Sequence, residues 1–436
     1  MKKQKIQTGA EISERYNSTF SQAAILNDTK EGEEETRRTL FRRHKDRILY
    51  SGGFRRLQDK TQVLSATKNG DHRTRLTHTL EVEQIATSIS DALSLNRDLA
   101  SAIAYGHDIG HTPFGHAAER VLNDLLEGCG GFSHAIQSVR FIKNKNIEVD
   151  NLILEGILKH DTDIFVKEID NKQFDCANLK PNKLGFLEAQ VVYWADKLAY
   201  LSHDFEDFYN NGFYDKLKKS DSEQTGILRN ILSDIIGEQK IKEDISYFKI
   251  RDLIRNLLEN LIETSYANIT QILEEVNDAN STTFVDISTE KFDKKKEKIN
   301  TDKIAKIEGA KKDEEKKKID KDAKEQIKRA FSDSLIINLD DKKRKNYFDL
   351  RALLDKHYIM SSEVASSDAK AKKIVKSLFD DFTKNINLLP LEIKTQIDSD
   401  KKNEFRIVAD YICSMTDSYA EEVYFNLNFP RKSYNY

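Results

Sequence analysis

Residues that interrupt or cross-link a chain are scarce in this sequence. Its 436 residues include only four prolines, 17 glycines and three cysteines. The cysteines Cys129, Cys176 and Cys413 form no CxxC pair, so neither a disulfide framework nor a thiolate zinc site is expected. The basic N-terminus lacks a following apolar run, and no stretch approaches the roughly 20 apolar residues of a membrane span. We therefore expect a soluble cytoplasmic protein with no membrane partner.

A strong excess of one charge is also lacking, because the formal net charge is only -3. Any nucleic-acid surface must therefore be a local patch. The candidate is the stretch over residues 291–329, which holds 16 Lys or Arg against 10 Asp or Glu. Its interleaved charges and few apolar residues favour a solvated helix or a mobile insertion. Aromatic residues are nearly absent from it, so base stacking is not supported.

The spacing of apolar residues predicts an all-α protein. Apolar residues recur three and four apart over long stretches, without alternating strands and helices and without a G-x-G-x-x-G loop. The helices expected are residues 76–93, 96–108 and 187–209, with further helical patterning over 348–382 and 405–427. The regions expected are an N-terminal arm over residues 1–45, a catalytic core over 46–215 and a helical C-terminal region over 216–436, with the lysine-rich insertion near 291–329.

Histidine is concentrated in one part of the chain, because seven of the ten lie within residues 72–160. His78 falls on the apolar face of its expected helix. Asp196 falls between Val192 and Tyr200 on the ridge of another helix. Charged or polar groups in such places need partners, and a divalent metal would satisfy both.

The adjacent pair His107 and Asp108 completes an H…HD…D pattern with His78 and Asp196. Two imidazoles and two carboxylates suit Mn²⁺ or Mg²⁺, with Fe²⁺ as a further candidate, and leave two coordination positions open. An open position can take a phosphate oxygen and a water whose pKa the metal lowers. The sequence therefore predicts a metal site that serves phosphate chemistry.

H…HD…D is the signature of the HD phosphohydrolase superfamily, and longer words around it resemble one of its families. The words are FRRLQDKTQV (54–63), RTRLTHTLEV (73–82), HDIGHTPFGHAAE (107–119), ADKLAYLSHDFED (195–207) and VADYICSMTDSYA (408–420). In this order they are similar to the motif series of the bacterial dGTP triphosphohydrolases. The resemblance spans nearly the whole chain, with the lysine-rich stretch matched least. It implies a helical HD-domain core with additional C-terminal helices.

The resemblance implies roles for the residues at the matching positions. The metal ligands would be His78, His107, Asp108 and Asp196. His116 and Glu119 match the catalytic His and Glu, and their i, i+3 spacing lets the carboxylate orient the imidazole. An imidazolium at His116 could protonate the leaving 5′ oxygen, or the imidazole could prepare the attacking water.

Substrate contacts follow from the same resemblance. The residues expected at the phosphates are Arg75, His111 and Lys197, and those expected at the sugar are Gln62, Tyr200 and Asp204. Asp204 would accept a hydrogen bond from the 3′ hydroxyl, and Tyr200 would crowd the 2′ carbon and disfavour ribonucleotides. Ordinary core packing is the alternative for Tyr200.

Other histidines receive no role from the sequence. Ala135 follows His134 where the family usually has Asn, so the sequence assigns His134 no function. Four more are expected to be structural or exposed: His44, His72, His160 and His357.

The implied activity is hydrolysis of dGTP, with other dNTPs as further substrates, to deoxynucleoside and tripolyphosphate. One alternative is an HD enzyme for another nucleotide, which would lack the Gln62, Tyr200 and Asp204 set or carry extra histidine ligands for a second metal. The other is a non-enzymatic single-stranded-DNA-binding relative, which would show an eroded site. The family also implies a homo-oligomer, often a hexamer, and single-stranded DNA as an added partner.

Overall fold

A computed structural model of the chain describes residues 39–62, 73–161, 177–179, 184–238, 250–280 and 335–429. These residues are mostly helical, and the only β-type pairing among them is an antiparallel bridge between Thr61 and Thr74. The all-α fold class is therefore confirmed. The lysine-rich stretch, most of the N-terminal arm and His72 lie outside the described residues. Within the described part, no helix is long and apolar enough to cross a membrane.

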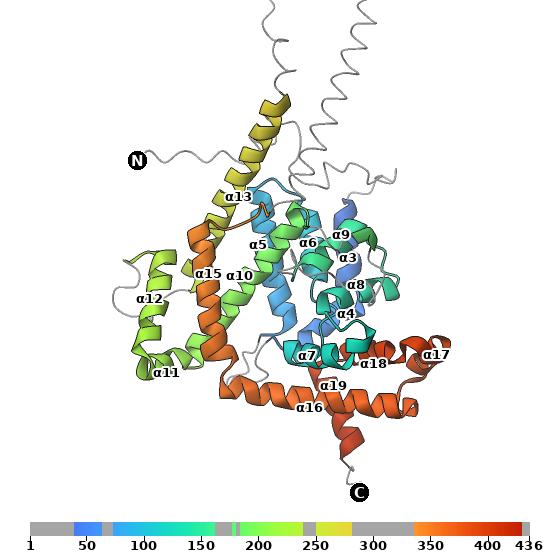
Figure 1. The fold of residues 1–436 in the computed structure, drawn as a ribbon. Coiled ribbons are helices and arrows are strands. Elements are labelled where there is room, and N and C mark those ends of the chain that lie inside the picture. The colour runs from blue at the N-terminus through green and yellow to red at the C-terminus, as the bar shows by residue number, and fades with distance from the viewer. Residues whose placement is uncertain are drawn as a thin grey trace, which may run out of the picture.

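Two long helices, α5 (Arg75–Ala92) and α10 (Leu187–Asn210), lie against each other at the centre of the molecule (Figure 1). α6 (Arg97–Gly106) contacts both of them, and α9 (Asn151–Lys159) contacts α6 and α10. α3 (Leu40–Leu49) packs on α6 and spans the arm boundary expected at residue 45. The three helices expected for this part of the chain are confirmed, with ends that differ by two residues or fewer.

Capping side chains explain where the central helices begin. The Thr74 side chain accepts a hydrogen bond from the backbone N–H of Thr77 at the start of α5, and Asn96 accepts one from Leu99 at the start of α6. The buried face of α5 carries Val82, which is fully buried. His78 shares that face, so the α5 sequence places an imidazole inside the core.

Three helices pack on α10: α11 (Phe213–Ser220), α13 (Ile250–Asn280) and α15 (Asp341–Leu354) (Figure 1). A fourth, α12 (Ser222–Ile236), packs against these three. Capping aspartates start two of them. Asp221 accepts from the backbone N–H of Gln224, and Asp340 accepts from that of Lys343. This layer buries the part of α10 that follows Asp196.

The helical patterning over 348–382 and 405–427 proves to be two broken segments. After α15 comes a π-helical turn, Asp355–Ile359, and then α16 (Ser362–Lys384) leaves in a new direction (Figure 1). Thr416 likewise separates α18 (Glu404–Cys413) from α19 (Asp417–Asn428) and caps the latter by accepting from the Tyr419 N–H. Apolar spacing continues across both breaks, so it does not reveal them.

The buried apolar residues form two separate clusters. The first fills the space between the helices from α3 to α15, except α7 (Gly115–Leu125). The second lies between α7 and the C-terminal helices α16, α18 and α19, and includes Leu122, Phe382 and Ile412. We call these the first core and the second core. The boundary expected at residue 215 stays a prediction.

Candidate active site

Three helical segments bring the four expected metal ligands together. His78 comes from α5, His107 and Asp108 follow the end of α6, and Asp196 comes from α10. His78 Nε2 lies 2.8 Å from Asp196 Oδ1, and His107 Nε2 lies 3.8 Å from the same oxygen. Ligand atoms of His78, His107 and Asp108 all lie within 4.8 Å of one another. The cluster has the donor types that a divalent transition metal takes.

The hydrogen bonds around His107 prepare it for a metal. Its Nδ1 lies 2.6 Å from the Ala104 carbonyl oxygen and donates to it, so the lone pair is on Nε2. That Nε2 is buried and has no hydrogen-bond partner. Metal-binding histidines typically donate their other ring N–H in this way. The orphaned nitrogen shows that the residues fit a metal ion.

Both carboxylates of the cluster are held in the ionised form that metal binding requires. Burial alone would raise the pKa of Asp108, but the Arg75 guanidinium and nearby histidines outweigh it and lower the pKa well below its usual value. Burial also opposes ionisation of Asp196, and the hydrogen bond and charge of His78 again lower the pKa.

Arg75 contacts the cluster directly. Its Nη1 donates to Asp108 Oδ2 over 2.6 Å, while its Nε and Nη2 are buried without a partner. One donor of Arg75 is therefore tied to a metal ligand, and the others remain for a phosphate. The phosphate role expected for Arg75 stays a prediction.

His116 and Glu119 meet on the first turn of α7 as their spacing predicts. His116 Nδ1 lies 2.8 Å from Glu119 Oε2. The other carboxylate oxygen, Oε1, accepts from the backbone N–H of His134 at 2.7 Å and lies 2.9 Å from His134 Nδ1. His134 is thus part of this network, although the sequence assigned it no function. Only His116 of the three has a substantially exposed side chain, at 40%.

His111 lies beside this network. Its ring stacks on that of His134 with centroids 4.6 Å apart and meets the His116 ring edge-on at 4.9 Å. Both of its ring nitrogens are buried without a hydrogen-bond partner. Burial, reinforced by the Arg75 charge, lowers its pKa well below the usual value, so His111 is neutral.

A strained turn leads from the HD pair into α7. Phe114 has a φ of 60° and Gly115 one of 63°, in the left-handed region that few residues other than glycine adopt. A Cβ at Gly115 would lie 3.3 Å from the Gln62 carbonyl oxygen. Asp417 Oδ1, from the start of α19, accepts from the Phe114 N–H at 2.8 Å. Strain of this kind is typical of functional sites.

Two of the three residues expected at the sugar, Tyr200 and Asp204, lie further along α10. Asp204 is fully buried and forms an ion pair with Arg351 of α15, while its second oxygen has no partner. The Arg351 guanidinium lies 4.2 Å from the centroid of the Tyr200 ring. Burial raises the pKa of Asp204 to about 6 against the opposing charge of Arg351. Sequence reasoning missed Arg351, whose partner lies 147 residues away.

The other two expected contacts differ in their surroundings. The Gln62 side chain is buried, and its Oε1 has no hydrogen-bond partner. The Lys197 ammonium lies 4.6 Å from the centroid of the Tyr193 ring. Their roles toward substrate stay predictions.

The histidines expected to be structural or exposed differ in their burial and in their partners. His44 is buried, and its Nδ1 accepts from the Asp150 N–H at 3.2 Å, which is a structural role. His357 is half-buried. His160 is buried beside the site, with its ring centroid 5.0 Å from that of His107. Of the two expectations for His160, structural or exposed, the structure leaves the first, because its Nδ1 lies 2.7 Å from the Ile157 carbonyl oxygen and donates to it.

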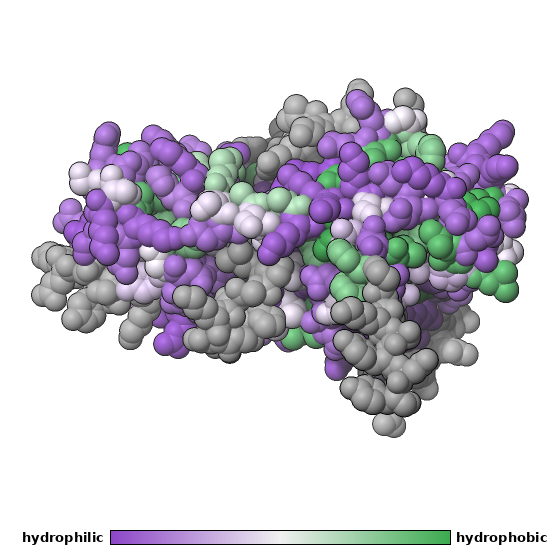
Figure 2. All heavy atoms as spheres, turned by 90° about the horizontal axis from the view of Figure 1, so that it is seen from below, coloured by the Kyte–Doolittle hydropathy of each residue, from purple (hydrophilic) through white to green (hydrophobic). Residues whose placement is uncertain are grey.

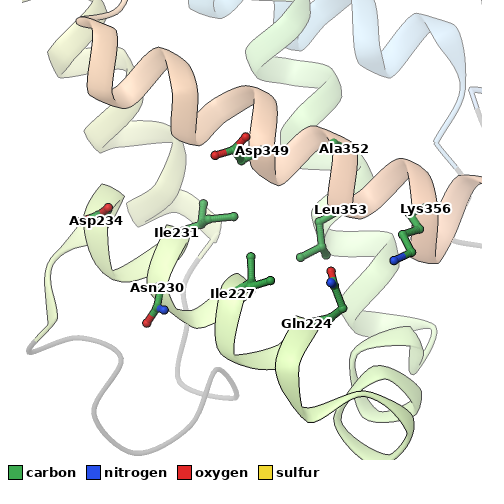
Figure 3. A pocket seen from close by; sticks show the side chains of 9 residues that line it. All are labelled: Gln224, Ile227, Asn230, Ile231, Asp234, Asp349, Ala352, Leu353 and Lys356. Carbon is green, nitrogen blue, oxygen red and sulfur yellow. The ribbon is translucent and has the colours of Figure 1, made fainter.

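A groove of about 380 Å³ lies outside this site, between α12 and α15 (Figure 3). Its lining includes the apolar side chains of Ile227, Ile231 and Leu353. The carboxylate of Asp234 at its edge pairs with Lys342. The groove holds no histidine and lacks the paired ligands of a metal site, so we place the chemistry at the histidine cluster.

The fold and the cluster define an HD-domain hydrolase. The HD domain family matches residues 75–201, which include all four metal-ligand candidates. The phosphohydrolase-associated domain family matches residues 337–426, which contain α15 to α18 and most of α19. HD domains are metal-dependent, in agreement with the buried His and Asp cluster.

Relatives place the chain more closely. It is 32% identical over 403 residues to the deoxyguanosinetriphosphate triphosphohydrolase-like protein of Rickettsia peacockii (strain Rustic). The aligned region covers 89% of this chain and 91% of the relative. The protein of that name from Syntrophus aciditrophicus (strain SB) is 34% identical, over 89% and 86% of the two chains. The chain belongs to this family of deoxyguanosinetriphosphate triphosphohydrolase-like proteins within the HD superfamily. The resemblance seen in the sequence motifs is confirmed.

Proposed function

We propose that the protein hydrolyses deoxynucleoside triphosphates, dGTP first among them, to deoxynucleoside and tripolyphosphate. The observation that carries the proposal is the arrangement along α10. Asp196 at the metal cluster is followed two turns later by Asp204, whose free oxygen is buried beside Tyr200 and Arg351. Eight residues of helix span about 12 Å. A ligand lying along this helix would have its phosphates at the cluster and its sugar at Asp204.

His78, His107, Asp108 and Asp196 would hold the divalent metal, Mn²⁺ or Mg²⁺ with Fe²⁺ as an alternative. When bound, the metal supplies Lewis-acid stabilisation of the phosphate and lowers the pKa of a water. The unpaired donors of Arg75 would bind a phosphate oxygen, with His111 and Lys197 as further contacts. These residues would fix the α-phosphate for attack.

His116 would donate the proton that the leaving 5′ oxygen needs. Glu119 supports this role because its carboxylate accepts from His116 Nδ1 and stabilises the imidazolium. In the reaction, the water oxygen forms a bond to the α-phosphorus and the bond from phosphorus to the 5′ oxygen breaks. The 5′ oxygen takes the proton from His116 and leaves in the deoxynucleoside, while the water oxygen stays on the tripolyphosphate. The attacking water gives up a proton to the solvent, and His116 takes one back from the solvent, so that one water is consumed overall.

Discrimination of the sugar would come from the other end of the site. The free oxygen of Asp204 would accept a hydrogen bond from a 3′ hydroxyl. This bond would offset the energetic cost of burying an oxygen that has no partner. The Tyr200 ring, held by Arg351, would leave no room at the 2′ carbon for a hydroxyl. Gln62 would contact the sugar through its free Oε1.

The test is product analysis with each dNTP and with GTP, alone and in pairs, in Mn²⁺ and in Mg²⁺. We expect tripolyphosphate and deoxynucleoside in equal amounts from dGTP, and much slower turnover of GTP. Pyrophosphate or orthophosphate as the primary product would contradict the proposal and favour the other HD enzymes. His116→Asn should lower kcat by about 10²–10⁴-fold. His357→Asn, which replaces a histidine far along the chain, is the matched control.

We also propose two partners and a location from the family resemblance. The partners are further copies of the chain, as in a hexamer, and single-stranded DNA, and the location is the cytoplasm. Apolar side chains lie among polar ones on the underside formed by the C-terminal helices (Figure 2). Phe405 of α18 and Phe425 of α19 are 51% and 53% exposed. Light scattering coupled to size-exclusion chromatography would give the oligomer number. A wholly monomeric protein at micromolar concentration would contradict the oligomer.

A further inference from the structure

One buried histidine of α10 takes no part in the metal set or in the proposed reaction. His203 lies in the turn between Tyr200 and Asp204, and its side chain is 1% exposed. Its ring meets the ring of the expected metal ligand His78 edge-on, with centroids 5.4 Å apart. The His107 ring meets His78 in the same manner at 5.6 Å. His78 therefore contacts two imidazoles, and the metal set uses only one of them.

Glu81 determines which nitrogen of His203 carries a proton. Its Oε2, on α5 one turn after His78, pairs with His203 Nε2. Burial opposes ionisation of Glu81, but the hydrogen bond from His203 outweighs it and lowers the pKa of this carboxyl. An ionised carboxylate can only accept, so His203 Nε2 donates. The neutral ring then has its lone pair on Nδ1, which is buried and has no hydrogen-bond partner.

His78 requires an acceptor at its second ring nitrogen. Its Nε2 lies 2.8 Å from Asp196 Oδ1, so Nε2 is the atom that would bind a metal together with Asp196. A neutral imidazole bound through Nε2 carries its proton on Nδ1. His78 Nδ1 is buried and has no partner. A buried N–H without an acceptor is costly, so metal binding would be weakened unless a neighbour accepts this proton.

The separation of the two rings suits one hydrogen bond between them. The His134 and His160 rings provide a comparison within the same protein, because their Nε2 atoms lie 3.2 Å apart and their centroids 5.2 Å apart. The 5.4 Å between the His78 and His203 centroids is close to that value. A hydrogen bond, direct or through one water, can therefore join the donor on His78 to the lone pair on His203.

We propose that Glu81 and His203 form a hydrogen-bonded relay that positions the metal ligand His78. Glu81 holds the His203 proton on Nε2, and His203 Nδ1 accepts the Nδ1 proton of metal-bound His78. His203 is a positioning residue, because it acts through His78. Metal-binding histidines typically have such an outer partner, whose loss weakens metal binding by about 10–100-fold. The inference rests on the metal set of the proposed function, but not on its substrate.

Three other roles for His203 make different predictions. Direct metal binding is disfavoured, because His203 belongs to no group of potential ligand atoms within 4.8 Å of one another in the described part of the chain. A doubly protonated His203 would place a positive charge beside His78, and its removal would strengthen metal binding. A purely structural link between α5 and α10 would affect the stability of the fold and leave the metal affinity unchanged.

The test is the Kd for Mn²⁺ of the full-length protein, measured by titration with Mn²⁺ alone and detection of the free ion by electron paramagnetic resonance. His203→Leu should raise this Kd by about 10–100-fold. His203→Asn places an amide oxygen near the position of Nδ1 and should restore nearly the wild-type Kd. His44→Leu, which replaces a buried histidine with a structural hydrogen bond, is the matched control. An unchanged or lower Kd in His203→Leu, or equal rises in His203→Leu and His203→Asn, would overturn the proposal.

Glu81 gives a second test at a side chain that is 46% exposed, where a substitution disturbs the core less. In Glu81→Leu, the His203 proton is free to move to Nδ1, so the Kd should rise, but less than in His203→Leu. The double variant should bind Mn²⁺ as His203→Leu does, because Glu81 acts only through His203. Circular dichroism would confirm that the variants are folded. Additive rises in the double variant would contradict the relay.

The outcomes separate this inference from the proposed function. Tripolyphosphate from dGTP together with an unchanged Kd in His203→Leu would leave the function intact and remove the relay. Weaker Mn²⁺ binding in His203→Leu, in a protein that hydrolyses no dNTP, would keep the relay and remove the function.

Discussion

The first and second cores hold different parts of the same site. The first core fixes the metal ligands His78, His107 and Asp196 on helices that pack directly on one another. The second core fixes α7, which carries His116 and Glu119 on its first turn and buries Leu122 against the C-terminal helices. Metal binding and proton delivery therefore depend on different packing. Substitutions should be able to separate the two.

The largest effect is expected from a metal ligand in the first core. His107→Ala removes the buried Nε2 that faces Asp196. We expect loss of bound metal and a fall in activity on the order of 10³-fold, since the metal supplies the main stabilisation of the transition-state charge. Metal content and initial rate on the same sample are the measurements. A variant that keeps both its metal and its rate would show that His107 is not a ligand.

Packing substitutions in the two cores should differ in their effect on metal content, because only those in the first core should cause loss of metal. Phe382→Ala in the second core and Phe208→Ala in the first each remove a fully buried ring and should lower the free energy of unfolding by about 3–5 kcal/mol. Phe382→Ala should lose activity while it keeps bound metal, because only α7 loses support. Phe208→Ala should lose metal. Calorimetry with metal analysis tests this, and identical behaviour of the two variants would contradict the division.

A smaller effect is expected where the cores are joined. Asp417 accepts from the Thr61 N–H at 3.0 Å and from the Phe114 N–H at 2.8 Å. Asp417→Ala would free the strained turn before His116, and a displacement of about 1 Å there can reduce kcat by about 10²-fold. The exposed Asp398→Ala on α17 (Leu391–Ser399) is the control. Steady-state kinetics and metal content should show lower kcat with unchanged metal. Unchanged kcat would mean that the turn is held by other contacts.

The smallest effect concerns pH and Lys60. This buried lysine donates to the carbonyl oxygens of His111 and Cys413, so it links the HD segment to α18. Burial lowers its pKa from 10.5 to about 8. Between these values the unfolded chain binds more protons than the folded protein, so the contribution of Lys60 to stability rises with pH.

Denaturant unfolding of the wild type and Lys60→Met at pH 7.5 and pH 10 measures this contribution. We expect the free energy of unfolding of the wild type to increase relative to the variant by on the order of 1–3 kcal/mol. If the difference in free energy of unfolding between the two proteins stays constant or shrinks as the pH rises, burial does not lower the pKa of Lys60.

Sequence patterns predicted the parts of the site that depend on local spacing. The helices bearing His78 and Asp196 follow from apolar periodicity, and the contact between His116 and Glu119 follows from their i, i+3 relation. The family words supplied the H…HD…D set as a whole. These features need only one helix, or a motif that is already known, to be recognised.

The rest of the site depends on tertiary packing that no local pattern encodes. Arg351 reaches Asp204 only because α15 packs on α10, and Asp417 reaches Phe114 only through the second core. His134 and His160 each lie on a separate short helix or at its end, so their contact is invisible in the sequence. The helix breaks at residues 355–361 and 414–416 were also missed, because apolar spacing continues through them.

The two hydrogen bonds that Asp417 accepts have a consequence for protein synthesis. A nascent chain emerging from the ribosome can form α5, α6 and α10 long before Asp417 is added. The turn before His116 would lack its anchor until α19 has been translated. The metal ligands could therefore assemble early, whereas a catalytically ordered α7 would appear only after Asp417 has left the ribosome.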